Sequence, residues 1–246
     1  MSKHGVLRLT YVVAALLSGV AARAETTLYV GNVAPYAYLE GAPQRGLVYE
    51  LIHETALRAG HSGVVHVVPL RRQIEMLLHE ADSLGSVTRL PEREALFSWP
   101  VKLMQEPIAL VTLTGSAIDI SSVPAAKRLR VGVMLGGPAE AVARRIGFAQ
   151  IQTTTNNKNN VSKLIAGRID AIVVLGGLFA TVEAMPDASA PHLREGAVLD
   201  RVDVYLAGAP GMASAEMQKW SDAFQALRRD GGYARIMQRY HHAEDP

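Results

Sequence analysis

The chain has 246 residues, of which 49% are hydrophobic and 20% are charged, a composition that excludes both a multi-span membrane protein and a disordered chain. Its formal net charge is +2, and the basic residues are spread along the chain instead of forming a tract, which argues against nucleic-acid binding. It contains no cysteine, which excludes disulfides, thiol catalysis and cysteine–metal sites.

The first 24 residues have the three-part pattern of a cleaved signal peptide. Residues 3–8 form a basic start, residues 9–20 form an apolar run, and residues 22–24 place two alanines before Glu25. The apolar run is shorter than the ~20 residues that a membrane-spanning helix needs. We therefore expect an exported, periplasmic protein whose mature chain begins near Glu25, without a lipid because no cysteine lies near the cleavage site.

The mature chain alternates strand-like and helix-like segments, which predicts an α/β fold with a mainly parallel sheet. The first group comprises strands at 27–31, 64–69, 84–88 and 108–113, with helices at 46–59 and 73–79. A loop at 115–124 separates it from a second group. The second group comprises strands at 129–134, 169–175 and 202–206, a helix through Arg145, a polar loop at 153–160, and helices at 161–166, from 176, at 213–229 and at 233–240.

Five phrases occur in order between Thr27 and Tyr240. They are Val30-Gly31 with Pro35-Tyr36-Ala37-Tyr38, Gly46-Leu47-Val48-Tyr49-Glu50-Leu51, Thr88-Arg89-Leu90-Pro91-Glu92-Arg93 with Phe97-Ser98, Ala166-Gly167-Arg168-Ile169-Asp170-Ala171, and Asp230-Gly231-Gly232-Tyr233-Ala234-Arg235-Ile236. Together they resemble the family 3 extracellular solute-binding proteins, the amino-acid-type binding subunits of ABC importers.

The resemblance implies the type II periplasmic-binding-protein fold, in which two α/β lobes enclose a ligand cleft. Mapped onto this chain, it divides the sequence into a signal peptide at 1–24, a first lobe at 25–103 plus 204–246, and a second lobe at 104–203. Hinge closure of the lobes around a ligand is the motion expected of such a fold.

Arg93 is the first candidate for a ligand contact. It matches the arginine of the family's Thr-x-x-Arg phrase, and a planar guanidinium binds a carboxylate with two parallel hydrogen bonds. The spacing is irregular, with Pro91 at the counted position, so a solvated surface arginine is the alternative. Ser86 and Thr88 are further candidates, because the end of a strand presents hydroxyls to the cleft of an open α/β sheet.

Four more candidates have weaker patterns. Tyr36 and Tyr38 follow the first strand, where a tyrosine can stack on a ligand, although at least one is expected to face the core. Arg72 opens a helix in a phrase similar to Pro-Trp-x-Arg of one family branch, with the tryptophan missing. Gly137 precedes Pro138 at a helix start, where free N–H groups accept an anion, although every α/β lobe has such helix starts.

Leu175 occupies the position where amino-acid-binding relatives usually carry a carboxylate for the ligand's α-ammonium. A buried ammonium without a partner is costly. We therefore expect a ligand that lacks an α-ammonium, such as a carboxylate or other anion, or a carboxylate placed elsewhere in the cleft. Asp170 is expected to be a structural turn residue.

The sequence carries no pattern for a metal site, a cofactor, a nucleophile elbow or a phosphate-binding loop. We therefore expect a monomeric protein that binds a small polar solute for an ABC importer permease or a sensor domain, without catalysis. Two alternatives remain: a periplasmic enzyme of the dehydratase type, which requires a strongly shifted acid or base in the cleft, and an accessory protein that kept the fold but lost its ligand.

Overall fold

The structure is a computed structural model that describes residues 25–39, 46–183 and 192–242. The predicted signal peptide at 1–24 lies outside the described residues. Among the residues that the structure does describe, no helix is both long enough and apolar enough to cross a membrane.

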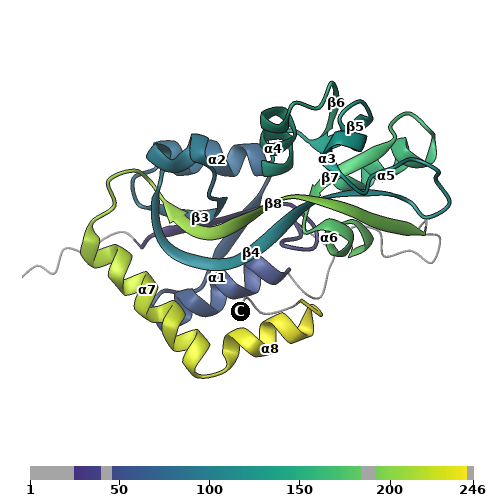
Figure 1. Ribbon diagram of the computed structural model, residues 1–246. Coiled ribbons are helices and arrows are strands. Elements are labelled where there is room, and N and C mark those ends of the chain that lie inside the picture. Colours follow the sequence, from purple (N-terminus) through teal and green to yellow (C-terminus); the bar gives the residue numbers. More distant parts are fainter. Residues whose placement is uncertain (1–24, 40–45, 184–191, 243–246) are drawn as a thin grey trace, which may run out of the picture.

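One eight-stranded sheet runs through both halves of the molecule in the order β2-β1-β3-β8-β4-β7-β5-β6. Two antiparallel strands of 16 residues each, β4 (Ser98–Leu113) and β8 (Leu193–Gly208), extend through both halves (Figure 1). In the first half, β8 borders the set formed by β2 (Val65–Val68), β1 (Thr27–Gly31) and β3 (Ser83–Thr88). In the second half, β4 borders the set formed by β7 (Ala171–Leu175), β5 (Arg130–Met134) and β6 (Gln150–Thr154).

Helices cover both faces of each half. They are α1 (Leu47–Arg58), α2 (Leu70–His79), the 3₁₀ helix η1 (Pro91–Leu96), α3 (Val123–Ala126), α4 (Pro138–Ile146), α5 (Asn157–Ile165), α6 (Gly177–Glu183), α7 (Ser214–Arg229) and α8 (Gly232–Arg239). Although α7 and α8 come last in the chain, they pack with α1 on one side of the first half, while α2 lies on the other side (Figure 1). The chain therefore passes between the halves twice, through β4 and through β8.

The two crossing strands are longer than the sequence predicts. The predicted strands at 108–113 and 202–206 are only parts of β4 and β8. In β4, prolines at 100 and 107 interrupt the strand pattern, and the structure accommodates irregular pairing with register shifts against β8. In the first half of β8, charged residues and a glycine interrupt the apolar pattern, so the sequence does not predict a strand there.

Two other predicted boundaries are also wrong. The predicted polar loop at 153–160 instead contains the end of β6 and the first turn of α5, which begins at Asn157. As the last strand of the sheet, β6 pairs only with β5, so its polar sequence is tolerated there. Helix α2 begins at Leu70, three residues before the predicted start, so Arg72 lies within its first turn.

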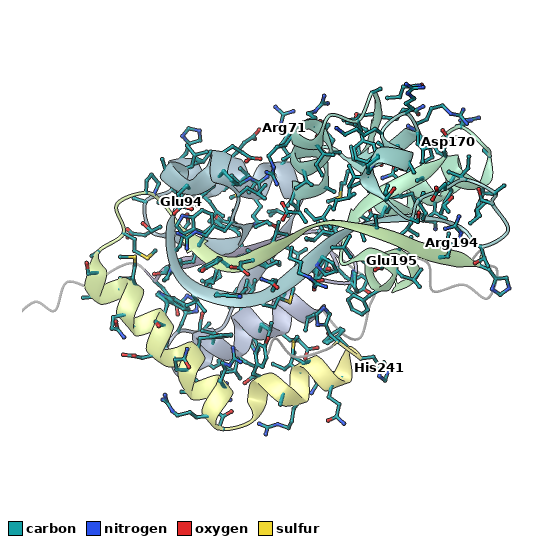
Figure 2. The ribbon with its side chains drawn as sticks, in the orientation of Figure 1. Arg71, Glu94, Asp170, Arg194, Glu195 and His241 are labelled. Atoms are coloured by element: carbon teal, nitrogen blue, oxygen red, sulfur yellow. The ribbon has the colours of Figure 1, made fainter. Side chains whose placement is uncertain are left out.

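Asp170 has the structural role that its place in a turn predicts. Its Oδ2 accepts the Arg130 backbone N–H at 2.8 Å, and its Oδ1 lies 2.6 Å from Arg130 Nη2. The hydrogen bonds from the Arg130 guanidinium lower the pKa of the Asp170 carboxyl. This pair ties the start of β7 to β5, and Figure 2 shows Asp170 in the second half.

Candidate functional site

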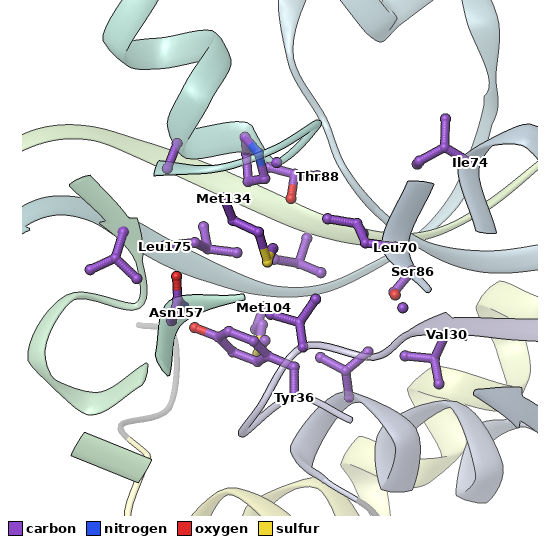
Figure 3. A pocket seen from close by; sticks show the side chains of 18 of the residues that line it. Val30, Tyr36, Leu70, Ile74, Ser86, Thr88, Met104, Met134, Asn157 and Leu175 are labelled. Atoms are coloured by element: carbon purple, nitrogen blue, oxygen red, sulfur yellow. The ribbon is translucent and has the colours of Figure 1, made fainter. Parts of the chain in front are cut away.

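A cavity lies where the two halves of the sheet meet (Figure 3). Its volume is about 70 Å³. Its walls come from both halves and from the crossing strands: Val30, Gly31, Val33, Tyr36, Val48, Leu70, Ile74, Ser86, Thr88, Arg93, Met104, Met134, Gly137, Pro138, Ala139, Asn157, Val173, Val174, Leu175 and Val204. A molecule in this cavity would therefore contact both halves at once.

The N-terminal turns of four helices reach the cavity wall. Val48 lies in the first turn of α1, Leu70 begins α2, Pro138 begins α4 and Asn157 begins α5. Helix N-termini carry partial positive charge and N–H groups without intrahelical partners. N–H groups at helix starts favour an anion, although Glu140 in the first turn of α4 already accepts the Gly136 N–H at 2.8 Å.

Arg93 adds a full positive charge to this wall. Its guanidinium donates from Nη2 to the Gly136 carbonyl at 3.1 Å, and from Nη1 to the Thr88 carbonyl at 3.4 Å. Thr88 ends β3 in the first half and Gly136 follows β5 in the second, so one side chain bridges the two. Within the described part of the chain no carboxylate pairs with Arg93, and burial lowers the pKa of its guanidinium.

Ser86 is held by a buried glutamine behind the cavity wall. Gln73, on α2, is fully buried, and its Nε2 donates to the Ser86 carbonyl at 2.5 Å and lies 3.5 Å from Ser86 Oγ. Because the amide approaches the hydroxyl as a donor, the Ser86 hydroxyl hydrogen is left to be donated elsewhere. Ser86 is thereby prepared to donate a hydrogen bond to an acceptor in the cavity.

Tyr36 stands between the cavity and a buried contact of Glu106 with His242 at the crossing. Glu106 on β4 is 1% exposed, and its Oε1 lies 2.6 Å from Nε2 of His242, just after α8. Burial first, and the Glu106 carboxylate second, raise the pKa of the Tyr36 hydroxyl well above its usual value. Gly176 has φ 78°, and any side chain there would collide with the Tyr36 hydroxyl. The tyrosine is thus neutral and fixed in place.

Searches for related proteins give a match in fold only. No family model and no curated protein matches the chain. A histidine kinase sensor domain with similarity to periplasmic binding proteins has a TM-score of 0.77 at 16% identity, over 90% of this chain and 99% of that one. An ancestral arginine-binding protein bound to glutamine has a TM-score of 0.74 at 19% identity, over 89% and 99% of the chains.

A third match is an ancestral amino-acid-binding protein described as a precursor of cyclohexadienyl dehydratase. Its TM-score is 0.70 at 19% identity, over 87% of this chain and 95% of that one. Other matches are substrate-binding proteins of amino acid ABC transporters. The chain has the two-lobed periplasmic-binding-protein fold. The likeness in fold that the sequence phrases predict is confirmed, and the two halves of the sheet are the lobes of that fold.

Five of the seven residues predicted as ligand contacts line the interlobe cavity of this binding-protein fold. They are Tyr36, Ser86, Thr88, Arg93 and Gly137. Tyr38 and Arg72 are not among the lining residues. Tyr38 lies past the turn that carries Tyr36, and Arg72 is exposed on α2 beyond the Leu70 that faces the cavity. Their roles as contacts remain predictions.

Asn157 is a lining residue that the sequence analysis does not identify. It is 8% exposed and begins α5, in a segment whose polar composition predicts a loop. The available signal is Asn156, whose side chain accepts the Asn159 N–H at 2.8 Å and caps the helix. Recognising that cap would have placed Asn157 at a helix N-terminus.

Leu175 lines the cavity at the end of β7, where the resemblance leads one to look for a carboxylate. No carboxylate, histidine or lysine is among the described residues that line the cavity. The described residues also contain no group of three or more metal-ligating side chains that could hold an ion. The described lining therefore offers one cation, hydroxyl groups, an amide and apolar side chains, but no negatively charged side chain.

Proposed function

We propose that this protein captures a small carboxylate-bearing solute in the periplasm by closing its lobes around it, and passes the solute to an ABC importer or a sensor. The observation that carries the proposal is Arg93, a cation without a carboxylate partner among the described residues, in the wall of a cavity that four helix N-termini also reach. A ligand carboxylate would supply the missing negative charge.

Lobe closure is supported by the position of the same arginine. Its contacts with the carbonyls of Thr88 and Gly136 come from different lobes. Because a ligand carboxylate on Arg93 would also face the α4 N-terminus, it would hold the lobes together. Release of the ligand would require the lobes to move apart, with the crossing strands β4 and β8 as the hinge.

The choice between delivery to an importer and sensing stays open within the proposal. Relatives in fold include both ABC-transporter binding proteins and a kinase sensor domain. The signal-peptide pattern of residues 1–24 supports export. Binding without turnover is favoured, because the described lining contains no carboxylate, histidine or lysine to act as a general acid or base.

Thermal unfolding of the mature protein with a panel of small solutes tests the proposal. The panel contains amino acids, monocarboxylates, dicarboxylates, polyamines and phosphorylated solutes. A ligand present at one hundred times its dissociation constant stabilises the folded state by about 2.7 kcal/mol. We expect stabilisation by at least one carboxylate and none by polyamines.

Stabilisation by polyamines alone would contradict the positive character assigned to the cavity. Absence of any response would favour an accessory protein that has lost its ligand. Chromatography of the mixture shows whether a stabilising solute is consumed. Its consumption would identify an enzyme instead of a binding protein.

A further inference from the structure

Most of the cavity wall is apolar. Polar groups come from Ser86, Thr88, Arg93, Asn157 and Tyr36. The remaining side chains larger than alanine are Val30, Val33, Val48, Leu70, Ile74, Met104, Met134, Pro138, Val173, Val174, Leu175 and Val204. Figure 3 shows such side chains reaching the cavity from both lobes. Apart from the group that Arg93 would bind, a ligand here gains free energy by burying apolar surface.

An ammonium group would find no charged partner in this wall. Val173, Val174 and Leu175 form the end of β7, and a charge buried against them would lose its hydration without compensation. The helix N-termini and Arg93 would repel it as well. The lining therefore discriminates against a ligand with an amine, by both desolvation and electrostatics.

Three carboxylates on the crossing strands β4 and β8 are engaged elsewhere. Glu106 lies 2.6 Å from His242, and Asp203 lies 2.9 Å from Lys102 Nζ. Glu195 accepts the backbone N–H of Leu178, in the first turn of α6, at 2.7 Å. None of the three lines the cavity, so none is placed to receive a ligand ammonium without breaking an existing contact.

The cavity favours a short ligand. A volume of about 70 Å³ has room for only a few water molecules between the apolar walls. A short branched monocarboxylate has a carboxylate for Arg93 and a few carbon atoms for the apolar wall. A long side chain with a terminal charge would have to place that charge among valines, leucines and methionines.

We propose that the ligand is a short monocarboxylate with an uncharged, apolar body and no amine. This inference rests on the proposed function, because it assumes that the interlobe cavity binds a carboxylate. It adds that Leu175 is a specificity-determining residue, which excludes α-amino acids.

Isothermal titration calorimetry with 3-methylbutanoate and L-valine tests the inference. The two compounds share a carboxylate and a branched body and differ only in the amine. We expect 3-methylbutanoate to bind the mature protein at least about 100-fold more tightly, since a site that leaves a buried polar group unpaired discriminates by such factors. Glutarate, which ends in a second carboxylate, is expected to bind more weakly than 3-methylbutanoate.

The Leu175→Asp variant should remove this preference, since it places a carboxylate at the end of β7. The ratio of the two affinities is expected to shift by at least about 100-fold toward L-valine. Leu175→Asn is the matched control, because it has the same shape without the charge and should weaken 3-methylbutanoate without favouring L-valine. Circular dichroism verifies that both variants are folded.

The possible outcomes separate the inference from the proposed function. Tighter binding of L-valine or glutarate than of 3-methylbutanoate by the unmodified protein overturns the inference and leaves carboxylate binding intact. Binding of none of these compounds also overturns it. If the solute panel then contains no carboxylate that stabilises the protein, the proposed function fails too.

Discussion

Replacing Arg93 by glutamine is expected to weaken carboxylate binding by roughly 100-fold or more, equivalent to about 2.7 kcal/mol. The guanidinium is the one full charge on the described cavity wall, and removing one partner of a buried, hydrogen-bonded charge pair leaves the ligand carboxylate unpaired. The variant also loses the contact with the Gly136 carbonyl that links the lobes. Calorimetric titration with 3-methylbutanoate measures the loss.

Arg71→Gln provides the matched control. Arg71 is exposed on α2 and pairs with Glu75 at 3.1 Å, so the variant has the same change in net charge without altering the cavity wall. We expect its affinity to stay within about twofold of the unmodified protein, since exposed ion pairs contribute little. Equal losses in both variants would show that Arg93 acts through the general electrostatic field and not by contact.

Removing the His242 side chain is expected to lower the free energy of unfolding by about 3 kcal/mol, because it leaves the buried Glu106 carboxyl group without its partner. The ring of His242 also contacts Phe179 of α6, with centroids 5.2 Å apart. His242 therefore connects the end of α8 in the first lobe to the crossing strand and to α6. Urea denaturation of His242→Ala measures the loss.

His241→Ala is the control for this prediction, since His241 is the exposed neighbour of His242 (Figure 2). Its effect is expected to stay within about 0.5 kcal/mol. Adding Glu106→Gln to His242→Ala should recover part of the lost stability, because a neutral amide costs less to bury than a carboxyl group that has lost its partner. Strictly additive effects of the two changes would contradict a direct interaction between them.

Several residues that define the cavity could be predicted from local sequence, where a strand ends in a hydroxyl or a helix begins with a glycine. Ser86, Thr88 and Gly137 are of this kind, and all three line the cavity. Leu175 could be placed by counting along the strand after Asp170. These positions depend on short stretches of chain, whose periodicity is visible in the sequence.

Other features of the site depend on contacts between distant segments. The pairing of Glu106 with His242 joins residues far apart in the chain, and nothing local to either residue predicts it. The full length of β4 was hidden for a different reason, because its two prolines are typical of breaks in a strand, and only the pairing with β8 shows that the strand continues through them. Arg93 was identified by resemblance, while its bridge to Gly136 required the fold.

The distance between the lobes with and without ligand tests the account most directly. The chain has no cysteine, so His79→Cys on α2 and Ala149→Cys before β6, both at exposed positions, allow one spin label on each lobe. Double electron–electron resonance is then measured with and without saturating 3-methylbutanoate. We expect a broad distribution that narrows and shifts to shorter distances when the carboxylate is added. An unchanged distribution would contradict closure of the lobes on a carboxylate.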